Sequence, residues 1–227
     1  MKLAEEARRL QETLLWPSDQ AVISYLRSGH IKNCNLTPVD LERANRILGP
    51  PKSILTSKMI APSQKNNDQT QLPMGSHSQP NIKLYVDVFF VNGLAFLYTK
   101  TKPLNYITIQ SLHLGKKTHH IIPRLKYVME KYTSRGYLIT DVFTDNKFDR
   151  DEYCQVFLPA NLHLCATGKH VPIIERSIQT IKERVGSTLQ GLPYTTLPRL
   201  MYTSLLERVE RTLNNFPHPW NRILFCR

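Results

Sequence analysis

The chain has 227 residues, of which 41% are hydrophobic, enough for one packed domain of ordinary size and an appendage. It carries 30 Lys and Arg against 18 Asp and Glu, which gives a net charge of +12. This charge favours an anionic partner, with nucleic acid more common than a membrane surface. An ordinary basic protein without such a partner can show the same charge. No apolar run approaches the roughly 20 residues of a membrane-spanning helix, and the N-terminus lacks the apolar core of a signal peptide, so we expect a soluble protein inside the cell.

The first segment, residues 1–48, is predicted to be helical. In "LAEEARRLQETLL" the apolar residues recur at helical spacing. The stretch "WPSDQAVISYLRSG" predicts a second short helix that begins at Ser18 or Asp19. A third helix is expected to follow Thr37 as its N-cap, with Pro38 at the first helical position. A helical piece of this size needs support from a partner or a neighbouring domain.

Residues 49–81 have a different composition. The stretch "PSQKNNDQTQLPMGSHSQPN" is polar and offers almost nothing to bury, so we expect a flexible linker. At the other end of the chain, residues 217–227 are expected to form an irregular tail.

The third segment, residues 82–216, alternates between strand and helix patterns. Two strands, "IKLYVDVFFVNG" and "LAFLYTKTK", are separated by Asn-Gly, which is a strong hairpin signal, and "NYITIQSLHL" is a plausible third strand. A helix capped by Thr118 follows, with its apolar face in "IIPRLKYVMEKY", and the strands "YLITDVFTD" and "LHLCAT" come next. Two helices close the segment at about 171–190 and 198–215. This order predicts an α/β fold: a ribonuclease-H-like mixed five-stranded sheet flanked by helices, preceded by the small helical segment.

Three acidic residues in this segment are candidates for a site. Asp87 lies within an apolar strand, Asp145 lies where a strand ends, and Glu175 lies near the start of a helix. Each one alone is most often a turn residue, a cap or a charge placed for the helix dipole. The nearby acids compete with them: Asp141 is interior to its strand and can face the other way, and three more surround a helix start, namely Asp149, Asp151 and Glu152.

Together, the three acids indicate a different chemistry. Asp87, Asp145 and Glu175 can converge on one edge of the sheet, where their mutual repulsion would be relieved by divalent cations. Hard oxygen ligands select Mg²⁺ or Mn²⁺. Two such ions can activate a nucleophile and stabilise the leaving oxygen in phosphoryl transfer.

The helix that carries Glu175 supports this interpretation. Glu175, Gln179 and Lys182 share one helical face beside an apolar stripe, so a carboxylate, an amide and an ammonium would line one ridge. Such a ridge can hold metal at one end and contact phosphates at the other. An ordinary solvated lysine is an equally common interpretation of Lys182. His170, which precedes the helix, can contact a phosphate, but a capping role or none is the more common case.

The stretches "LYVDVFFVNGLAF", "FTDNKF" and "HVPIIERSIQTIKERV" resemble the integrase catalytic core of copia-type long-terminal-repeat retrotransposons. The resemblance implies a D,D,E triad of Asp87, Asp145 and Glu175 that binds Mg²⁺ or Mn²⁺. It implies 3′-end processing and strand transfer, with DNA as the partner and contacts from Lys182 and Gln179. We expect an oligomer when the protein is active, because two DNA ends must be joined. We expect no membrane partner, and a nuclear location if the protein is functional.

The N-terminal segment is similar to the pre-integrase region of the same polyproteins, in which a His-His-Cys-Cys zinc module often occurs. Here only His30 and Cys34 are available, so no zinc site is expected. The chain also departs from the family after Asp145, where Lys147 stands beside the site, and at Ile173, where an acid is common.

Two alternatives remain open. The chain can be a catalytically decayed or co-opted remnant that only binds nucleic acid, because a basic surface can persist without chemistry. It can also be a different nuclease on the same fold, which would cut nucleic acid without joining it.

Overall fold

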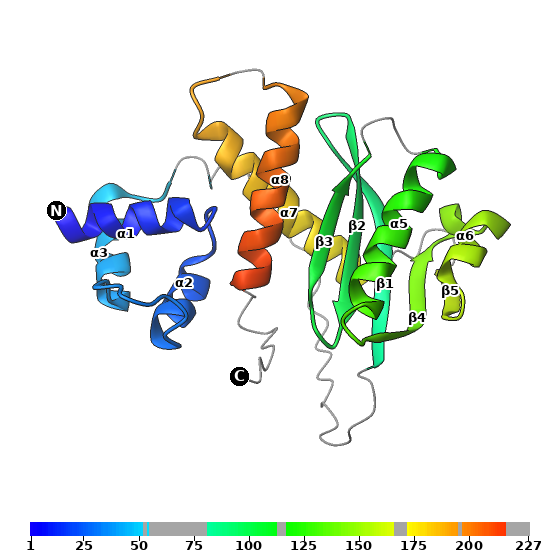
Figure 1. Cartoon of the computed structure of the whole chain (residues 1–227). Coiled ribbons are helices and arrows are strands. Elements are labelled where there is room, and N and C mark those ends of the chain that lie inside the picture. The colour runs from blue at the N-terminus through cyan, green and yellow to red at the C-terminus, as the bar shows by residue number, and fades with distance from the viewer. Residues whose placement is uncertain (52–53, 55–80, 113–116, 166–171, 195–196, 217–227) are drawn as a thin grey trace. The chain divides into compact units, whose positions relative to one another are not determined.

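The computed structural model describes residues 1–51, 54, 81–112, 117–165, 172–194 and 197–216 (Figure 1). The predicted linker 49–81 lies mostly outside these residues, and the predicted tail 217–227 lies wholly outside them. Within the described part of the chain, no helix combines the length and apolar character needed to cross a membrane.

The chain forms two compact units. One comprises residues 1–63 together with 180–227, and the other comprises residues 64–179. The division falls within one continuous helix. The domain boundaries predicted from the sequence, after residues 48, 81 and 216, therefore stay predictions.

The second unit contains the predicted five-stranded mixed sheet, and the α/β fold class is confirmed. The strands run in the spatial order β3-β2-β1-β4-β5. The first three pair antiparallel, while β4 pairs parallel to β1 and β5 parallel to β4. Their bounds are β1 Asn81–Val91, β2 Leu94–Lys102, β3 Ile107–Ser111, β4 Leu138–Asp145 and β5 Asn161–Cys165.

Asn-Gly forms the hairpin turn between β1 and β2, as its chemistry predicts. Asn92 has φ of 48° and Gly93 has φ of 74°, the left-handed conformation that both turn residues of a tight hairpin require. This turn fixes the register in which Asp87 lies opposite Tyr98.

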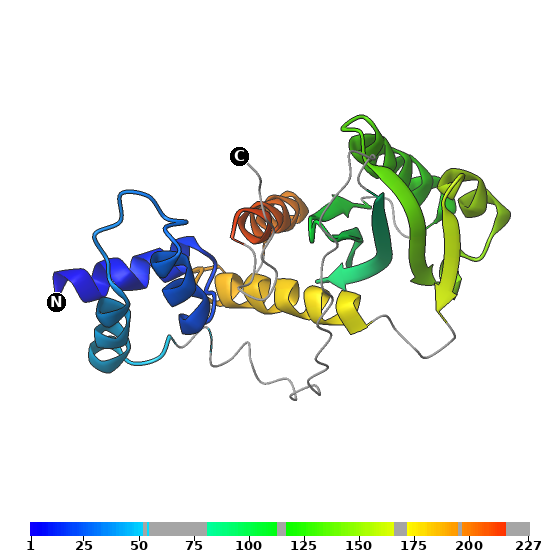
Figure 2. The same ribbon diagram turned by 90° about the horizontal axis from the view of Figure 1, so that it is seen from below.

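Helices cover both faces of the sheet in this unit (Figure 2). One face packs on α5 (Thr118–Thr133) and α6 (Asp151–Phe157), and a short 3₁₀ turn, η1 (Asn146–Phe148), precedes α6. The core between them joins alternate strand residues to the predicted apolar face of α5: Ile82, Leu84, Val86, Val142, Ile121, Leu125, Val128 and Tyr132. The other face meets the first turns of α7 (Pro172–Gln190), because the Tyr98 hydroxyl donates to Ser177 Oγ at 2.6 Å.

Thr118 does not cap α5 as predicted. The helix begins at Thr118 itself, with Lys117 at the N-cap position and no side-chain cap bond. The Thr118 hydroxyl instead accepts a hydrogen bond from the Arg150 guanidinium at 3.1 Å. A tertiary contact has therefore replaced the local one that the sequence suggested.

The first unit contains the three predicted N-terminal helices, α1 (Lys2–Thr13), α2 (Asp19–Arg27) and α3 (Pro38–Leu48), together with α8 (Arg199–Asn215) and the second half of α7. Ser18 caps α2 by accepting a hydrogen bond from the Ala21 amide at 3.3 Å. Thr37 and Asp40 form a reciprocal capping box at the start of α3.

Long side chains and carbonyl groups hold these helices together within the unit. Arg184 of α7 is only 8% exposed and donates to the Leu14 carbonyl at 3.2 Å. Tyr25 of α2 donates its hydroxyl to the Phe216 carbonyl at 2.9 Å. Burial lowers the pKa of Arg184, with the Tyr25 hydroxyl partly offsetting that effect. The helical segment thus receives the support that its size required, from the C-terminal part of the same chain.

Candidate active site at the ends of two parallel strands

Asp87 and Asp145 lie on the same face of the sheet. Tyr85 and Phe143 are register partners on the parallel strands β1 and β4, and their rings stack with centroids 4.9 Å apart and planes 14° apart. Side chains on a strand alternate between faces, so the residues two positions further along share the face of these rings. Asp87 and Asp145 occupy those two positions. The two carboxylates therefore belong to one face of the sheet, with Asp145 at the carboxyl end of β4 and Asp87 within β1.

Each carboxylate is partly fixed by the backbone that follows it. Asp87 Oδ1 accepts from the Val88 amide at 2.7 Å, and Asp145 Oδ1 accepts from the Asn146 amide at 2.7 Å. Both residues are half-buried. One oxygen of each group is thus oriented by a local hydrogen bond.

Lys147 supplies a cation to this pair. Its Nζ lies 2.9 Å from Asp145 Oδ2, and its side chain is 69% exposed. The hydrogen bond from Lys147 to Asp145 raises the pKa of the lysine, and the charges of Asp145 and Asp87 raise that pKa further. Both aspartates therefore lie within electrostatic range of this ammonium group, and Asp145 is its direct partner. The lysine expected beside the site from the sequence is indeed there.

Glu175 lies in the first turn of α7 and is exposed. Tyr98, the cross-strand partner of Asp87, hydrogen-bonds to Ser177 of the same helix, so this helix begins over the face that carries the two aspartates. Within the described ranges, however, no three His, Cys, Asp or Glu side chains form a group that could hold a metal ion. Asp87 and Asp145 lie on the same face of the sheet, and the triad as a whole stays a prediction.

The two aspartates match the donor set of a hard divalent cation. Carboxylate oxygens suit Mg²⁺ and Mn²⁺, and adjacent carboxylates repel each other unless a cation is near. Here the Lys147 ammonium meets that need. Asp87 and Asp145 are thus the residues that would hold a metal, with Lys147 as its competitor.

The other predicted site residues are only partly described. On α7, Gln179 is half-buried and Lys182 is exposed, beside the expected buried stripe of Ile174, Ile178, Ile181 and Val185. Gln179 belongs to the sheet unit, and Lys182 belongs to the helical unit on the same continuous helix. His170 lies outside the described residues.

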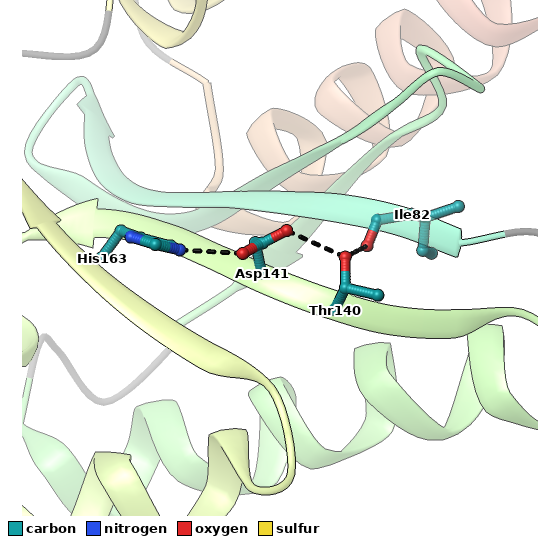
Figure 3. Close-up of polar contacts among 4 residues, drawn as sticks. All are labelled: Ile82, Thr140, Asp141 and His163. Atoms are coloured by element: carbon teal, nitrogen blue, oxygen red, sulfur yellow. Dashed lines mark hydrogen bonds and ion pairs between the residues drawn. The ribbon is translucent and has the colours of Figure 1, made fainter. Parts of the chain in front are cut away.

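A pair that sequence reasoning missed lies on the same face as the two aspartates. Asp141 was expected to be able to point to the opposite face of the sheet, and this is wrong. It lies two residues before Phe143 and four before Asp145 on β4, so all three side chains are on one face. Its Oδ1 lies 2.8 Å from His163 Nε2 on β5, and its Oδ2 accepts from the Thr140 hydroxyl at 2.9 Å (Figure 3). These two hydrogen bonds, with His163 first, lower the pKa of Asp141. Period-two alternation within "TDVFTD" was the signal that could have shown the shared face.

Comparisons with known proteins place the fold. No protein-family model matches the chain, and no curated protein does. Among solved structures, the chain is similar to the catalytic core domain of BIV integrase, at 11% identity over 58% of this chain and 82% of that one, with a TM-score of 0.44. It is also similar to a chain of the simian T-cell lymphotropic virus intasome in complex with the PP2A regulatory subunit B56 gamma. That match has 11% identity, covers 86% of this chain and 66% of that one, and has a TM-score of 0.50. With the observed strand order, it shows the fold alone, a ribonuclease-H-like mixed sheet flanked by helices.

Proposed function

We propose that this chain is the catalytic core of a copia-type retrotransposon integrase. It acts on DNA in two steps, 3′-end processing and strand transfer, and both are attacks on a phosphodiester, first by water and then by a 3′-hydroxyl. The observation that carries the proposal is that Asp87 and Asp145 lie on one face of the sheet, with Lys147 paired to Asp145. The net charge of +12 supports a DNA partner.

The residues have distinct roles in this proposal. Asp87, Asp145 and Glu175 would hold Mg²⁺ or Mn²⁺, which supplies Lewis acidity to the phosphoryl group when bound. The fixed orientation of the Asp87 and Asp145 carboxylates would limit the rearrangement needed for binding. Gln179 and Lys182 would contact the DNA backbone along α7. Joining two DNA ends requires more than one subunit, so we expect an oligomer in the active state, acting in the nucleus.

A second candidate has its own supporting observation. In the Lys147–Asp145 ion pair, the lysine occupies a carboxylate that metal binding would need. Such a lysine fits a decayed retrotransposon remnant that keeps the fold and binds nucleic acid but does not catalyse a reaction. The two candidates differ in whether a covalent change to DNA occurs, which is directly measurable.

The test uses branched DNA in which one strand is already joined to a target duplex. By microscopic reversibility, an integrase core can resolve this branch and reseal the target strand without bringing two ends together. The protein is incubated with Mn²⁺ and a set of branched duplexes with randomised arm sequences, and the labelled target strand is followed on denaturing gels. We expect a resealed strand with the natural sequence and none with Glu175→Gln.

Controls separate the alternatives. Glu130→Gln changes an exposed glutamate on α5, on the other face of the sheet, and should remain active. Activity that survives Glu175→Gln would remove Glu175 from the triad. No covalent change in any natural-sequence reaction would favour the binding-only remnant. Cutting of RNA–DNA hybrids without resealing would favour a different nuclease on this fold.

A further inference from the structure

A row of side chains crosses the sheet next to the two aspartates. Lys100, Tyr85, Phe143 and His163 are successive register partners on β2, β1, β4 and β5. They occupy the face that carries Asp87 and Asp145, two residues earlier along β1 and β4. The row thus lies beside the candidate active site, within the same compact unit.

Three rings of this row form a continuous stack. The centroids of Tyr85 and Phe143 are 4.9 Å apart with planes 14° apart, and those of Phe143 and His163 are 4.7 Å apart with planes 13° apart. The spacing equals the distance between neighbouring strands, so each strand contributes one ring. Such near-parallel ring faces are the arrangement on which a nucleobase stacks.

The stack is open at one end. Tyr85 is buried and Phe143 is half-buried, whereas the His163 side chain is 47% exposed. His163 belongs to β5, the last strand in the order of the sheet. In the described part of the chain, no further strand therefore follows to continue the stack beyond His163.

The outermost ring is held in place rather than left to rotate. His163 Nε2 lies 2.8 Å from Asp141 Oδ1, and the other oxygen of Asp141 accepts from Thr140 (Figure 3). An ionised carboxylate only accepts hydrogen bonds, so Nε2 carries the proton in this contact. A ring that is already oriented loses less freedom when a flat ligand stacks on it.

Lysines lie around the ring stack on the same face. Lys83 is exposed, is the register partner of Asp141, and holds its Nζ 6.0 Å from the centroid of the Phe143 ring. Lys102 is the half-buried partner of Lys83 on β2, whereas Lys100, in the ring row itself, is buried and is not part of the exposed surface. Aromatic rings interleaved with cations are the composition of surfaces that bind single-stranded nucleic acid.

We propose that the Tyr85–Phe143–His163 stack holds an unpaired nucleobase of a DNA strand, stacked on His163, with a neighbouring phosphate near Lys83. This inference rests on the proposed function for the presence of DNA at Asp87 and Asp145. It adds a place on the protein for one unpaired base, at the exposed end of the ring stack. A purely structural role for the Asp141–His163 pair, which would only fasten β5 to β4, predicts no preference for unpaired ends.

The experiment compares two DNAs on the full chain. Fluorescence anisotropy measures the affinity for a blunt duplex and for the same duplex with a three-nucleotide overhang that contains 2-aminopurine, whose quenching reports stacking. We expect the overhang to bind about 10-fold more tightly and its fluorescence to be quenched. His163→Ala should remove the preference and the quenching, and His163→Phe should retain both, because a phenyl ring stacks without the bond to Asp141.

Tyr127→Ala is the matched control, since Tyr127 is an aromatic residue that is 53% exposed on α5, on the other face of the sheet. It should leave the preference unchanged, and circular dichroism checks that every variant is folded. Equal affinity of the natural chain for both DNAs overturns the inference, as does a folded His163→Ala that keeps the preference. Loss of the preference in His163→Phe overturns it too, because stacking would then not be the cause.

The branched-DNA reaction reports independently on the proposed function. Resealing without an overhang preference overturns only the ring-stack inference. An overhang preference without resealing supports the inference and overturns the catalytic proposal. Absence of any DNA binding by the natural chain at low salt overturns both.

Discussion

The ammonium group of Lys147 lies 2.9 Å from Asp145 Oδ2, the carboxylate two residues earlier in the sequence. The charge of Asp87 also raises the pKa of Lys147. The lysine is exposed and flexible, so this ion pair adds little to folding stability. Its consequence is electrostatic: the Lys147 charge and a divalent cation compete for the same carboxylates.

Removing that charge is expected to strengthen metal binding. Lys147→Met should increase the affinity for Mn²⁺ by about 5-fold, because one unit charge some 4 Å away is worth roughly 1 kcal/mol in water. Isothermal titration calorimetry measures the change. Lys126→Met, at an exposed lysine of α5 on the opposite face, should leave the affinity unchanged. An unaltered affinity in Lys147→Met would mean that Asp145 is not a metal ligand.

Lys182→Ala tests the DNA-binding ridge of α7. Loss of one phosphate contact should weaken DNA binding and reduce the slope of log affinity against log salt by about one. The measurement is anisotropy with a blunt duplex over a series of salt concentrations. Lys126→Met serves again as the control. An unchanged slope in Lys182→Ala would remove Lys182 from the DNA-binding surface.

Lys100 is expected to destabilise the fold at neutral pH. Burial, with a smaller effect from Lys102, lowers the pKa of Lys100 from 10.5 to about 8. The unfolded chain therefore binds this proton more tightly than the folded chain does. The resulting decrease in the free energy of unfolding is complete below pH 8 and disappears as the pH rises toward 10.5.

Lys100→Met should accordingly raise the free energy of unfolding by roughly 2–3 kcal/mol at pH 7, and by much less at pH 10. Urea unfolding at both pH values measures the difference. Lys126→Met should change neither value by more than about 0.5 kcal/mol. A Lys100→Met variant with no gain at pH 7 would show that the ammonium remains well hydrated in the folded protein.

Asp141 should contribute to the acid sensitivity of the sheet unit. Its hydrogen bonds from His163 and Thr140 lower its pKa below the ordinary value of 3.8. The stabilisation is therefore present above pH 3.8 and is lost as the pH falls through the lower folded-state value. Asp141→Asn should melt at a lower temperature than the natural chain at pH 6, and the two melting curves should converge near pH 2. A constant difference at all pH values would contradict this origin.

Tyr25→Phe tests the attachment of the helical segment. The Tyr25 hydroxyl donates to the Phe216 carbonyl and also interacts with the buried Arg184. Leaving those groups without their partner should cost about 1–3 kcal/mol in the free energy of unfolding. Urea unfolding followed by tryptophan fluorescence reports the change, because Trp16 lies between α1 and α2. Tyr127→Phe, at an exposed hydroxyl, should be neutral.

Much of the fold could be predicted because its signals are local. The Asn92-Gly93 turn, the Ser18 cap and the Thr37 capping box each depend on a few adjacent residues, and all three are present in the structure. The apolar face of α5 follows from helical periodicity in the same way. Thr118 is the exception, since Arg150, distant in sequence, binds its hydroxyl.

The site was predictable only in part. Their places in apolar strand patterns and the resemblance to integrase cores selected Asp87 and Asp145, and the structure puts them on one face of the sheet. It does not bring Glu175 into a metal-binding group with them within the described residues. The Asp141–His163 pair and the ring stack depend on the register between β4 and β5, and no motif in the sequence encodes that register.

By itself, the sequence indicated most of the helices and strands and the faces they bury, because these properties depend on neighbouring residues and on periodicity. Only the tertiary structure decided which distant groups meet: His163 with Asp141 across β5 and β4, Arg150 with Thr118, and Arg184 with the Leu14 carbonyl at the end of α1. The last of these contacts joins residues 170 positions apart, and each forms only when burial of the core of its own unit fixes one packing.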